Sequence, residues 1–207
     1  TRYGSNTTII GADLFNEPWA TPWSTLRTLF QTCGNHIHTI APDWLIFCGG
    51  GQNSANTFWH GGNLEQVSTL PVTLAIANRV VYAPHEYGHS VGGQSWLATS
   101  GNTPANWPLN LNVKRRTVWS YIFEEGIAPV LVGEFGGKFG WNNDGTASGD
   151  GNAPFERVWL NNLIDHMNGD FEGDGFSNLT GNQVGMSYAY WSFNANSGDT
   201  GDRKSVV

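Results

Sequence analysis

The alternation of short apolar runs with longer amphipathic stretches is the feature that most constrains the fold of this chain. Five short runs have the length and β-branched content of buried strands, at 8–15, 44–48, 79–87, 129–136 and 186–193. Three longer stretches have apolar residues at helical spacing, at 22–41, 110–125 and 154–167. Because strands that alternate with helices form βαβ units, this order predicts an α/β fold with a parallel sheet.

Polar or aromatic residues lie at the ends of four of the five runs. These residues are Glu17, His85, Glu134 and Trp191. In a (β/α)8 barrel the chemistry takes place at the C-terminal ends of the strands. Neither a GxGxxG fingerprint nor a P-loop follows any run, which disfavours a nucleotide-binding sheet. We therefore expect a (β/α)8 TIM barrel.

The number of strands indicates that this barrel is partial. A complete barrel has eight strands and takes about 250 residues, whereas this chain has 207 residues and five strand candidates. We expect residues 1–207 to be a single, partial catalytic domain that covers roughly strands 4 to 8. Alone, such a chain would expose parallel strand edges and apolar helix faces.

Composition limits the partners. Charged residues make up only 13% of the chain and the net charge is −7, so we expect no nucleic acid partner. No window approaches the run of about 20 apolar residues that a membrane helix needs, so we expect no membrane partner. The 10 Trp residues and the low charge suit a neutral, hydroxyl-rich ligand such as a polysaccharide. We expect a monomer without a cofactor.

Glu17 and Glu134 each end an apolar run and are candidates for paired chemistry. Glycoside hydrolysis needs one carboxyl group that donates a proton to the leaving oxygen. It needs a second, ionised carboxylate that attacks the anomeric carbon or activates water. The alternative is that each glutamate is a capping or ion-pairing group.

Four motifs carry a resemblance to a known family. They are DLFNEP at 13–18, YAPHEY at 82–87, LVGEFG at 131–136 and YWSFN at 190–194. With them the chain resembles glycoside hydrolase family 5, which includes many endo-β-1,4-glucanases. Their order matches strands four, six, seven and eight of that family's barrel, and residues 196–201 extend the match.

The resemblance implies a role for each matching residue. Glu17 would be the general acid/base, and Asn16 would bind the 2-hydroxyl of the sugar under attack. Glu134 would be the nucleophile that forms a covalent glycosyl-enzyme, so that the anomeric configuration is retained. His85 and Tyr87 would support the site, Tyr87 within reach of the nucleophile. Trp191 would stack under the sugar at the cleavage point.

The family also places an arginine and a histidine on earlier strands, which this chain does not contain. We therefore expect little or no turnover from the chain alone. The resemblance implies a retaining endo-acting hydrolase of cellulose-like β-1,4-glucan, and because such a polymeric substrate lies outside the cell we expect the protein to be secreted. A β-mannanase or mixed-linkage β-glucanase with the same machinery stays open, as does a non-catalytic carbohydrate-binding protein. A purely structural role of the glutamates would leave the four motifs unexplained.

Other polar groups predict no further site. His36 and His38 are two residues apart in a helical stretch, so they face different directions and do not form a zinc site. Residues 168–173 hint at a calcium loop, but Leu179 stands where the loop's glutamate is expected. The basic run at 114–116 is predicted to be a solvent-exposed helix face. We expect no metal.

Overall fold

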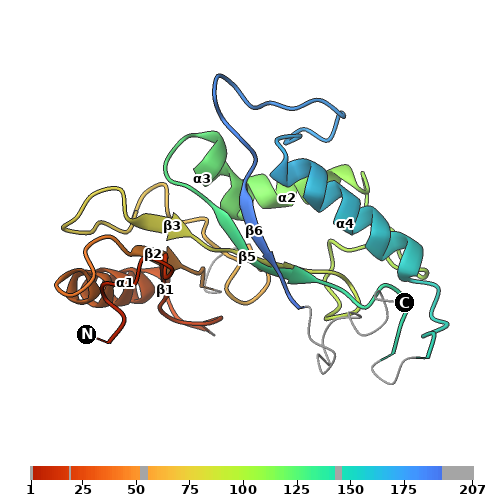
Figure 1. Ribbon diagram of the computed structural model, residues 1–207. Helices are drawn as coiled ribbons and strands as arrows, with labels where there is room; N and C mark the ends of the chain where they lie inside the picture. Colours follow the sequence, from red (N-terminus) through yellow and green to blue (C-terminus); the bar gives the residue numbers. More distant parts are fainter. Residues whose placement is uncertain (1, 19, 52–55, 143–145, 193–207) are drawn as a thin grey trace. The chain divides into compact units, whose positions relative to one another are not determined.

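The computed structural model describes residues 2–18, 20–51, 56–142 and 146–192, and its elements follow the predicted order (Figure 1). They are β1 (Gly11–Asp13), α1 (Trp23–His38), β2 (Leu45–Cys48), β3 (Val80–Tyr82), β4 (His85–Tyr87), α2 (Leu109–Arg115), the π-helix η1 (Arg116–Ser120), α3 (Tyr121–Glu124), β5 (Leu131–Gly136), α4 (Ala153–Met167) and β6 (Ser187–Tyr190). Each predicted run contains a strand. The motif residues at 193–194 and 196–201 lie outside the described residues. Among those described, no helix combines the length and apolar character needed to cross a bilayer.

The third apolar run forms two strands instead of the one expected. Ala83 and Pro84 separate β3 from β4. Proline has no N–H group to donate to a strand ladder, so regular pairing is interrupted there. The carbonyl of Pro84 still accepts a hydrogen bond from the Gly133 N–H at 2.9 Å, so the segment between β3 and β4 remains bonded to β5.

The first three strands form a sheet in the order β1-β2-β3, with both neighbouring pairs parallel. Gly11 pairs with Leu45 and Ile46 pairs with Val80. The parallel pairing confirms the βαβ prediction for this part of the chain. A Cβ atom on Gly11 would lie 2.2 Å from the Leu45 carbonyl oxygen, so the close approach of β1 to β2 requires glycine. The remaining strands form a second sheet in the order β4-β5-β6.

The chain divides into two compact units. The first contains Thr1–His85 and Thr117–Gly133, and the second contains Glu86–Arg116 and Glu134–Val207, so the division passes through β4 and β5. In the first unit, Phe30 from α1 and Ile46 from β2 are completely buried. The rings of Trp23 and Tyr82 lie 6.3 Å apart in the same core. That residues 1–207 form one partial domain stays a prediction.

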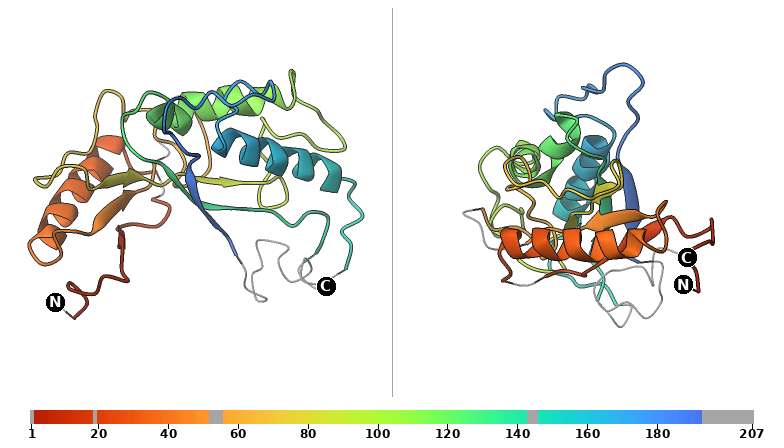
Figure 2. Two further views of the ribbon diagram at one scale, coloured as in Figure 1. Left: turned by 45° about the horizontal axis from the view of Figure 1, so that its top comes forward. Right: turned by 90° about the vertical axis from the view of Figure 1, so that its left-hand side faces the viewer.

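In the second unit α2 packs alongside α4 (Figure 2). The buried face of α4 includes Trp159, Leu163 and Met167, as its apolar stripe predicts. The buried face of α2 is more polar than expected, because Asn112 and Arg115 are both buried. Arg115 is only 1% exposed, so the prediction that the whole basic run at 114–116 faces solvent is wrong. A buried carboxylate, described below, explains why Arg115 points inward.

Candidate active site

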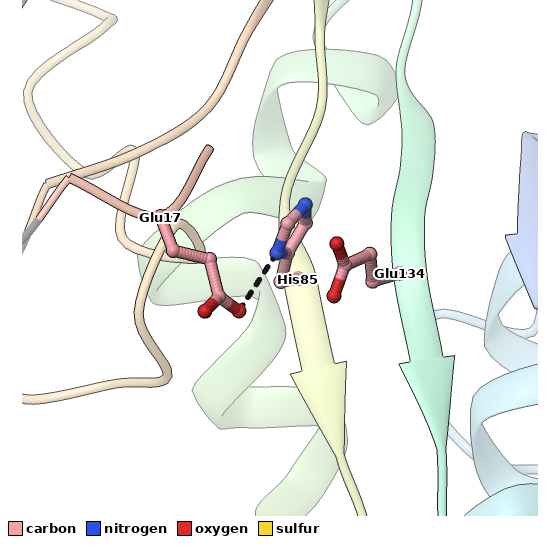
Figure 3. A group of neighbouring side chains, drawn as sticks. All are labelled: Glu17, His85 and Glu134. Atoms are coloured by element: carbon pink, nitrogen blue, oxygen red, sulfur yellow. Dashed lines mark hydrogen bonds and ion pairs between the residues drawn. The ribbon is translucent and has the colours of Figure 1, made fainter. Parts of the chain in front are cut away.

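Glu17 lies just after β1 and is hydrogen-bonded to a histidine. Its Oε1 atom is 3.0 Å from Nδ1 of His85, the first residue of β4 (Figure 3). The Glu17 side chain is 30% exposed, whereas the His85 side chain is 4% exposed. Glu17 has a φ of 44°, a left-handed conformation that is uncommon outside glycine. Such strain persists only where the surroundings enforce it, and it often occurs at functional sites.

The imidazole of His85 is held between two backbone segments. A Cβ atom on Gly61 would lie 3.2 Å from Nδ1, and one on Gly133 would lie 3.2 Å from Nε2. Both neighbours are therefore glycines that let the backbone approach the ring closely. This packing restricts the ring, so that Nδ1 stays directed toward the Glu17 carboxylate.

Glu134 lies on β5 and has a different partner. The hydroxyl group of Tyr87, the last residue of β4, donates a hydrogen bond to Oε2 of Glu134. Tyr87 is 6% exposed and Glu134 is half-buried. A hydroxyl donor stabilises the ionised form of a carboxylate. The Tyr87 hydroxyl therefore favours the ionised form of Glu134.

A single short strand thus supplies a partner for each glutamate. His85 and Tyr87 are two residues apart on β4, so their side chains leave the strand on the same face. The partners differ in chemistry. The imidazole nitrogen can donate a hydrogen bond to Glu17 or accept one from it, whereas the Tyr87 hydroxyl donates a hydrogen bond to Glu134. Two carboxyl groups with different environments are what divided acid and nucleophile roles require.

The other two predicted site residues have accessible side chains. Asn16 is exposed in the bend that follows β1. Trp191 is 43% exposed, and its backbone N–H donates to the Phe135 carbonyl at 2.9 Å. That bond fixes the start of the segment after β6 beside β5, while the indole ring keeps an open surface.

The sequence prediction missed the residue between His85 and Tyr87. Glu86 is 2% exposed, and strand alternation turns it to the opposite face of β4. Its carboxylate accepts from Nη2 of Arg115 at 2.6 Å, from Nε of Arg115 at 3.0 Å and from Nε1 of Trp159 at 2.8 Å. Nη1 of Arg115 donates to Asn162 at 2.5 Å. The sequence did contain an indication of this buried group, because Glu86 is a charged residue inside the apolar run at 79–87.

The same polar network reaches a buried histidine. Nδ2 of Asn162 donates to Oδ1 of Asn112 at 2.7 Å, and Nδ2 of Asn112 lies 3.2 Å from Nδ1 of His166. Burial lowers the pKa of His166 well below its usual value, and the positive charges of Arg115 and Arg116 lower it further. His166 is therefore neutral at neutral pH, with Nδ1 as an acceptor.

Glu17 and His85 are also residue types that bind divalent metals. The expected absence of a metal and of a cofactor stays a prediction.

Comparison with known proteins identifies the relatives of this chain. The family model described as Cellulase (glycosyl hydrolase family 5) matches residues 1–197. An endoglucanase of Paenibacillus polymyxa is 40% identical over 214 residues, which cover 97% of this chain and 46% of the relative. The major extracellular endoglucanase of Xanthomonas campestris pv. campestris is 31% identical, and the match covers 97% of this chain and 37% of the relative.

Solved structures that resemble this chain identify its fold. The endocellulase of Pyrococcus horikoshii, in a complex with cellotetraose, matches with a TM-score of 0.74 and 31% identity over 97% of this chain and 54% of that chain. The catalytic domain of the Xanthomonas endoglucanase matches with a TM-score of 0.70 and 28% identity, over 97% of this chain and 52% of that chain. These neighbours are (β/α)8 barrels, which confirms the predicted partial barrel. This chain spans about half the length of the relatives it matches, and it belongs to glycoside hydrolase family 5.

Proposed function

We propose that the enzyme containing this chain is a retaining endo-β-1,4-glucanase, with Glu17 as the general acid/base and Glu134 as the nucleophile. The observation that carries this proposal is the difference between the two partners on β4. His85 is bonded to Glu17 and Tyr87 is bonded to Glu134. Membership of glycoside hydrolase family 5 and the endoglucanase relatives support the same reaction.

In the first step Glu17 gives its proton to the glycosidic oxygen while Glu134 attacks the anomeric carbon. The bond from this carbon to the leaving oxygen breaks, and a carbon–oxygen bond to Glu134 forms. The Tyr87 hydroxyl, bonded to Oε2 of Glu134, stabilises the ionised carboxylate that attacks. The hydrogen bond to His85 orients the Glu17 carboxyl group toward the leaving oxygen.

In the second step Glu17, now ionised, takes a proton from water. The resulting attack on the anomeric carbon releases Glu134, and two inversions give net retention. Asn16 would bind the 2-hydroxyl, a contact that strengthens in the transition state. The exposed ring of Trp191 would stack against the sugar at the cleavage point.

The substrate that we propose is a cellulose-like β-1,4-glucan outside the cell. The low charge and the many aromatic residues suit a neutral polymer. A polymer of this size does not enter cells, and one relative is named an extracellular endoglucanase. A β-mannanase or mixed-linkage β-glucanase would use the same two glutamates and differ in the loops around them.

The test combines a substitution with a chemical label. Glu134→Gln is compared with Glu125→Gln, which changes an exposed glutamate in the same way. Both are assayed on carboxymethylated cellulose, in this chain and in a longer form that supplies the rest of a barrel. We expect Glu134→Gln to lower kcat by about 10⁴-fold or more, because the covalent step is lost. A 2-fluoro cellobiosyl fluoride should label the wild-type peptide that contains Glu134.

Several outcomes would contradict the proposal. A label on another carboxylate, or a product with inverted anomeric configuration by NMR, would remove Glu134 from the nucleophile role. Cleavage of mannan or mixed-linkage glucan in preference to cellulose derivatives would reassign the substrate. Binding without cleavage by the longer, folded form would support the non-catalytic alternative.

A further inference from the structure

A second buried glutamate, Glu156, bonds two loops that both follow strands of the site. It lies near the start of α4 and is 2% exposed. Its Oε1 atom accepts from the Ser90 backbone N–H at 3.1 Å and from the Ser90 hydroxyl at 2.5 Å. Its Oε2 atom accepts from the backbone N–H of Phe139 at 2.6 Å. One carboxylate therefore holds the segment after β4 and the segment after β5.

The two segments are also bonded to each other around this carboxylate. The Lys138 N–H donates to the Ser90 hydroxyl oxygen at 2.7 Å, so this hydroxyl both donates and accepts. The Gly88 N–H donates to the Gly136 carbonyl at 2.9 Å and continues the pairing of β4 with β5. We call the contacts of Glu156 with Ser90 and Phe139 the Glu156 clamp.

Close packing shows that the clamp has little freedom. A Cβ atom on Gly88 would lie 2.3 Å from Oε1 of Glu156, and one on Gly137 would lie 2.5 Å from the same atom. Any side chain at either position would collide with the carboxylate. Since a buried carboxylate is costly unless it is hydrogen-bonded, the three donors also account for its stability in this place.

We propose that Glu156 is a positioning residue that sets the hydrogen bond between Tyr87 and Glu134. Tyr87 directly precedes Gly88, and Glu134 lies three residues before Gly137, so the clamp fixes the backbone beside both groups. Glu156 acts on the reaction only through these neighbours. Misplacement of a reacting group by about 1 Å can cost about 100-fold in rate. The inference rests on the function proposed above.

The first test is Glu156→Gln in the longer form used above. The amide keeps the size of the carboxylate but turns an NH2 group toward donors, so at least one clamp bond is lost. We expect kcat to fall about 10-fold to 100-fold. The KM value should change less than about 2-fold, because Glu156 is not placed at the substrate. Glu172→Gln, at a side chain that is 53% exposed, is the matched control.

Two further readouts separate positioning from a general loss of stability. If Glu156 acts through the Tyr87 bond, Tyr87→Phe and Glu156→Gln should not be additive in kcat, because each removes the same interaction. The acidic limb of the kcat/KM profile should also move to higher pH in Glu156→Gln, since ionised Glu134 loses its donor. Additive effects with an unmoved pH profile would overturn the proposal.

Hydrogen exchange keeps the clamp testable even if the proposed function fails. In Glu156→Gln the amides at 88–90 and 137–139 should lose protection together, while the helix pair α2 and α4 keeps its own. Unchanged protection in both segments would overturn the clamp whatever the enzyme hydrolyses. If Glu156→Gln does not fold, Ser90→Ala removes one donor and should give a smaller effect in the same direction.

Discussion

The carboxylates on the two faces of β4 differ in burial and in hydrogen bonding. On one face His85 and Tyr87 are hydrogen-bonded to glutamates that are only partly buried. On the other face Glu86 is buried and fully engaged by Arg115 and Trp159. The first arrangement leaves Glu17 and Glu134 partly accessible to solvent. The second pairs the buried charge with the Arg115 guanidinium group, which suits Glu86 to a structural role in the strand.

The largest expected effect in this comparison is on stability. Arg115→Met should lower the free energy of unfolding by about 3–5 kcal/mol, because Glu86 is left as an uncompensated buried charge. Urea denaturation of the variant and the wild type measures this difference.

The neighbouring residue supplies the control. Arg116 pairs with Glu172 at 2.5 Å, but the two side chains are 41% and 53% exposed. Arg116→Met should therefore cost only about 0–1 kcal/mol. Equal losses from Arg115→Met and Arg116→Met would mean that burial does not distinguish the two arginines.

The next largest effect concerns the face of β4 that carries His85 and Tyr87. Tyr87→Phe removes the hydroxyl that donates to Glu134 and should lower kcat about 10-fold to 100-fold, since a hydrogen bond to a charged group contributes about 1.5–3 kcal/mol. Tyr188→Phe, at a side chain that is 63% exposed, is the matched control. Unchanged kcat in Tyr87→Phe would show that the hydroxyl does not assist Glu134.

The smallest effect is a pH dependence of stability, which arises from the buried His166. The pKa of His166 is lowered in the folded state, first by burial and then by Arg115 and Arg116. The unfolded chain therefore binds a proton that the folded chain does not, as the pH falls below about 6.5. Stability should drop by at most about 1.4 kcal/mol per pH unit below that point.

His166→Gln should remove this part of the pH dependence. His36→Gln changes an exposed histidine and is the control. The measurement is a series of urea denaturation curves between pH 7 and pH 5. A slope that is the same in His166→Gln and in the wild type would contradict the assignment.

The sequence predicted the elements better than it predicted their buried polar groups. Hydrophobic periodicity identified α1, α4 and the five strand regions, because burial of apolar side chains follows a fixed period in helices and strands. It placed Arg115 at the surface, since a basic run is usually solvated and the partner Glu86 is 29 residues away. Glu156 was missed for a related reason. Its donors come from loops, and loop geometry has no period.

The candidate site could be predicted only in part. The motifs placed Glu17, His85 and Glu134 at strand ends, and Tyr87 within reach of the nucleophile. The bond from Tyr87 to Glu134 is consistent with that expectation. The bond from His85 to Glu17 joins residues 68 positions apart and depends on the packing of Gly61 and Gly133 against the ring. The roles of all six proposed site residues stay predictions.

The glycines around the Glu156 clamp limit how the enzyme could be redesigned. In a library of variants selected for a new substrate, Gly88 and Gly137 should remain glycine, because any larger residue meets the Glu156 carboxylate. Gly93 has open space around its Cα atom and lies only five positions beyond Gly88. Side chains should therefore be tolerated at Gly93, while the adjoining residues of the clamp stay constant.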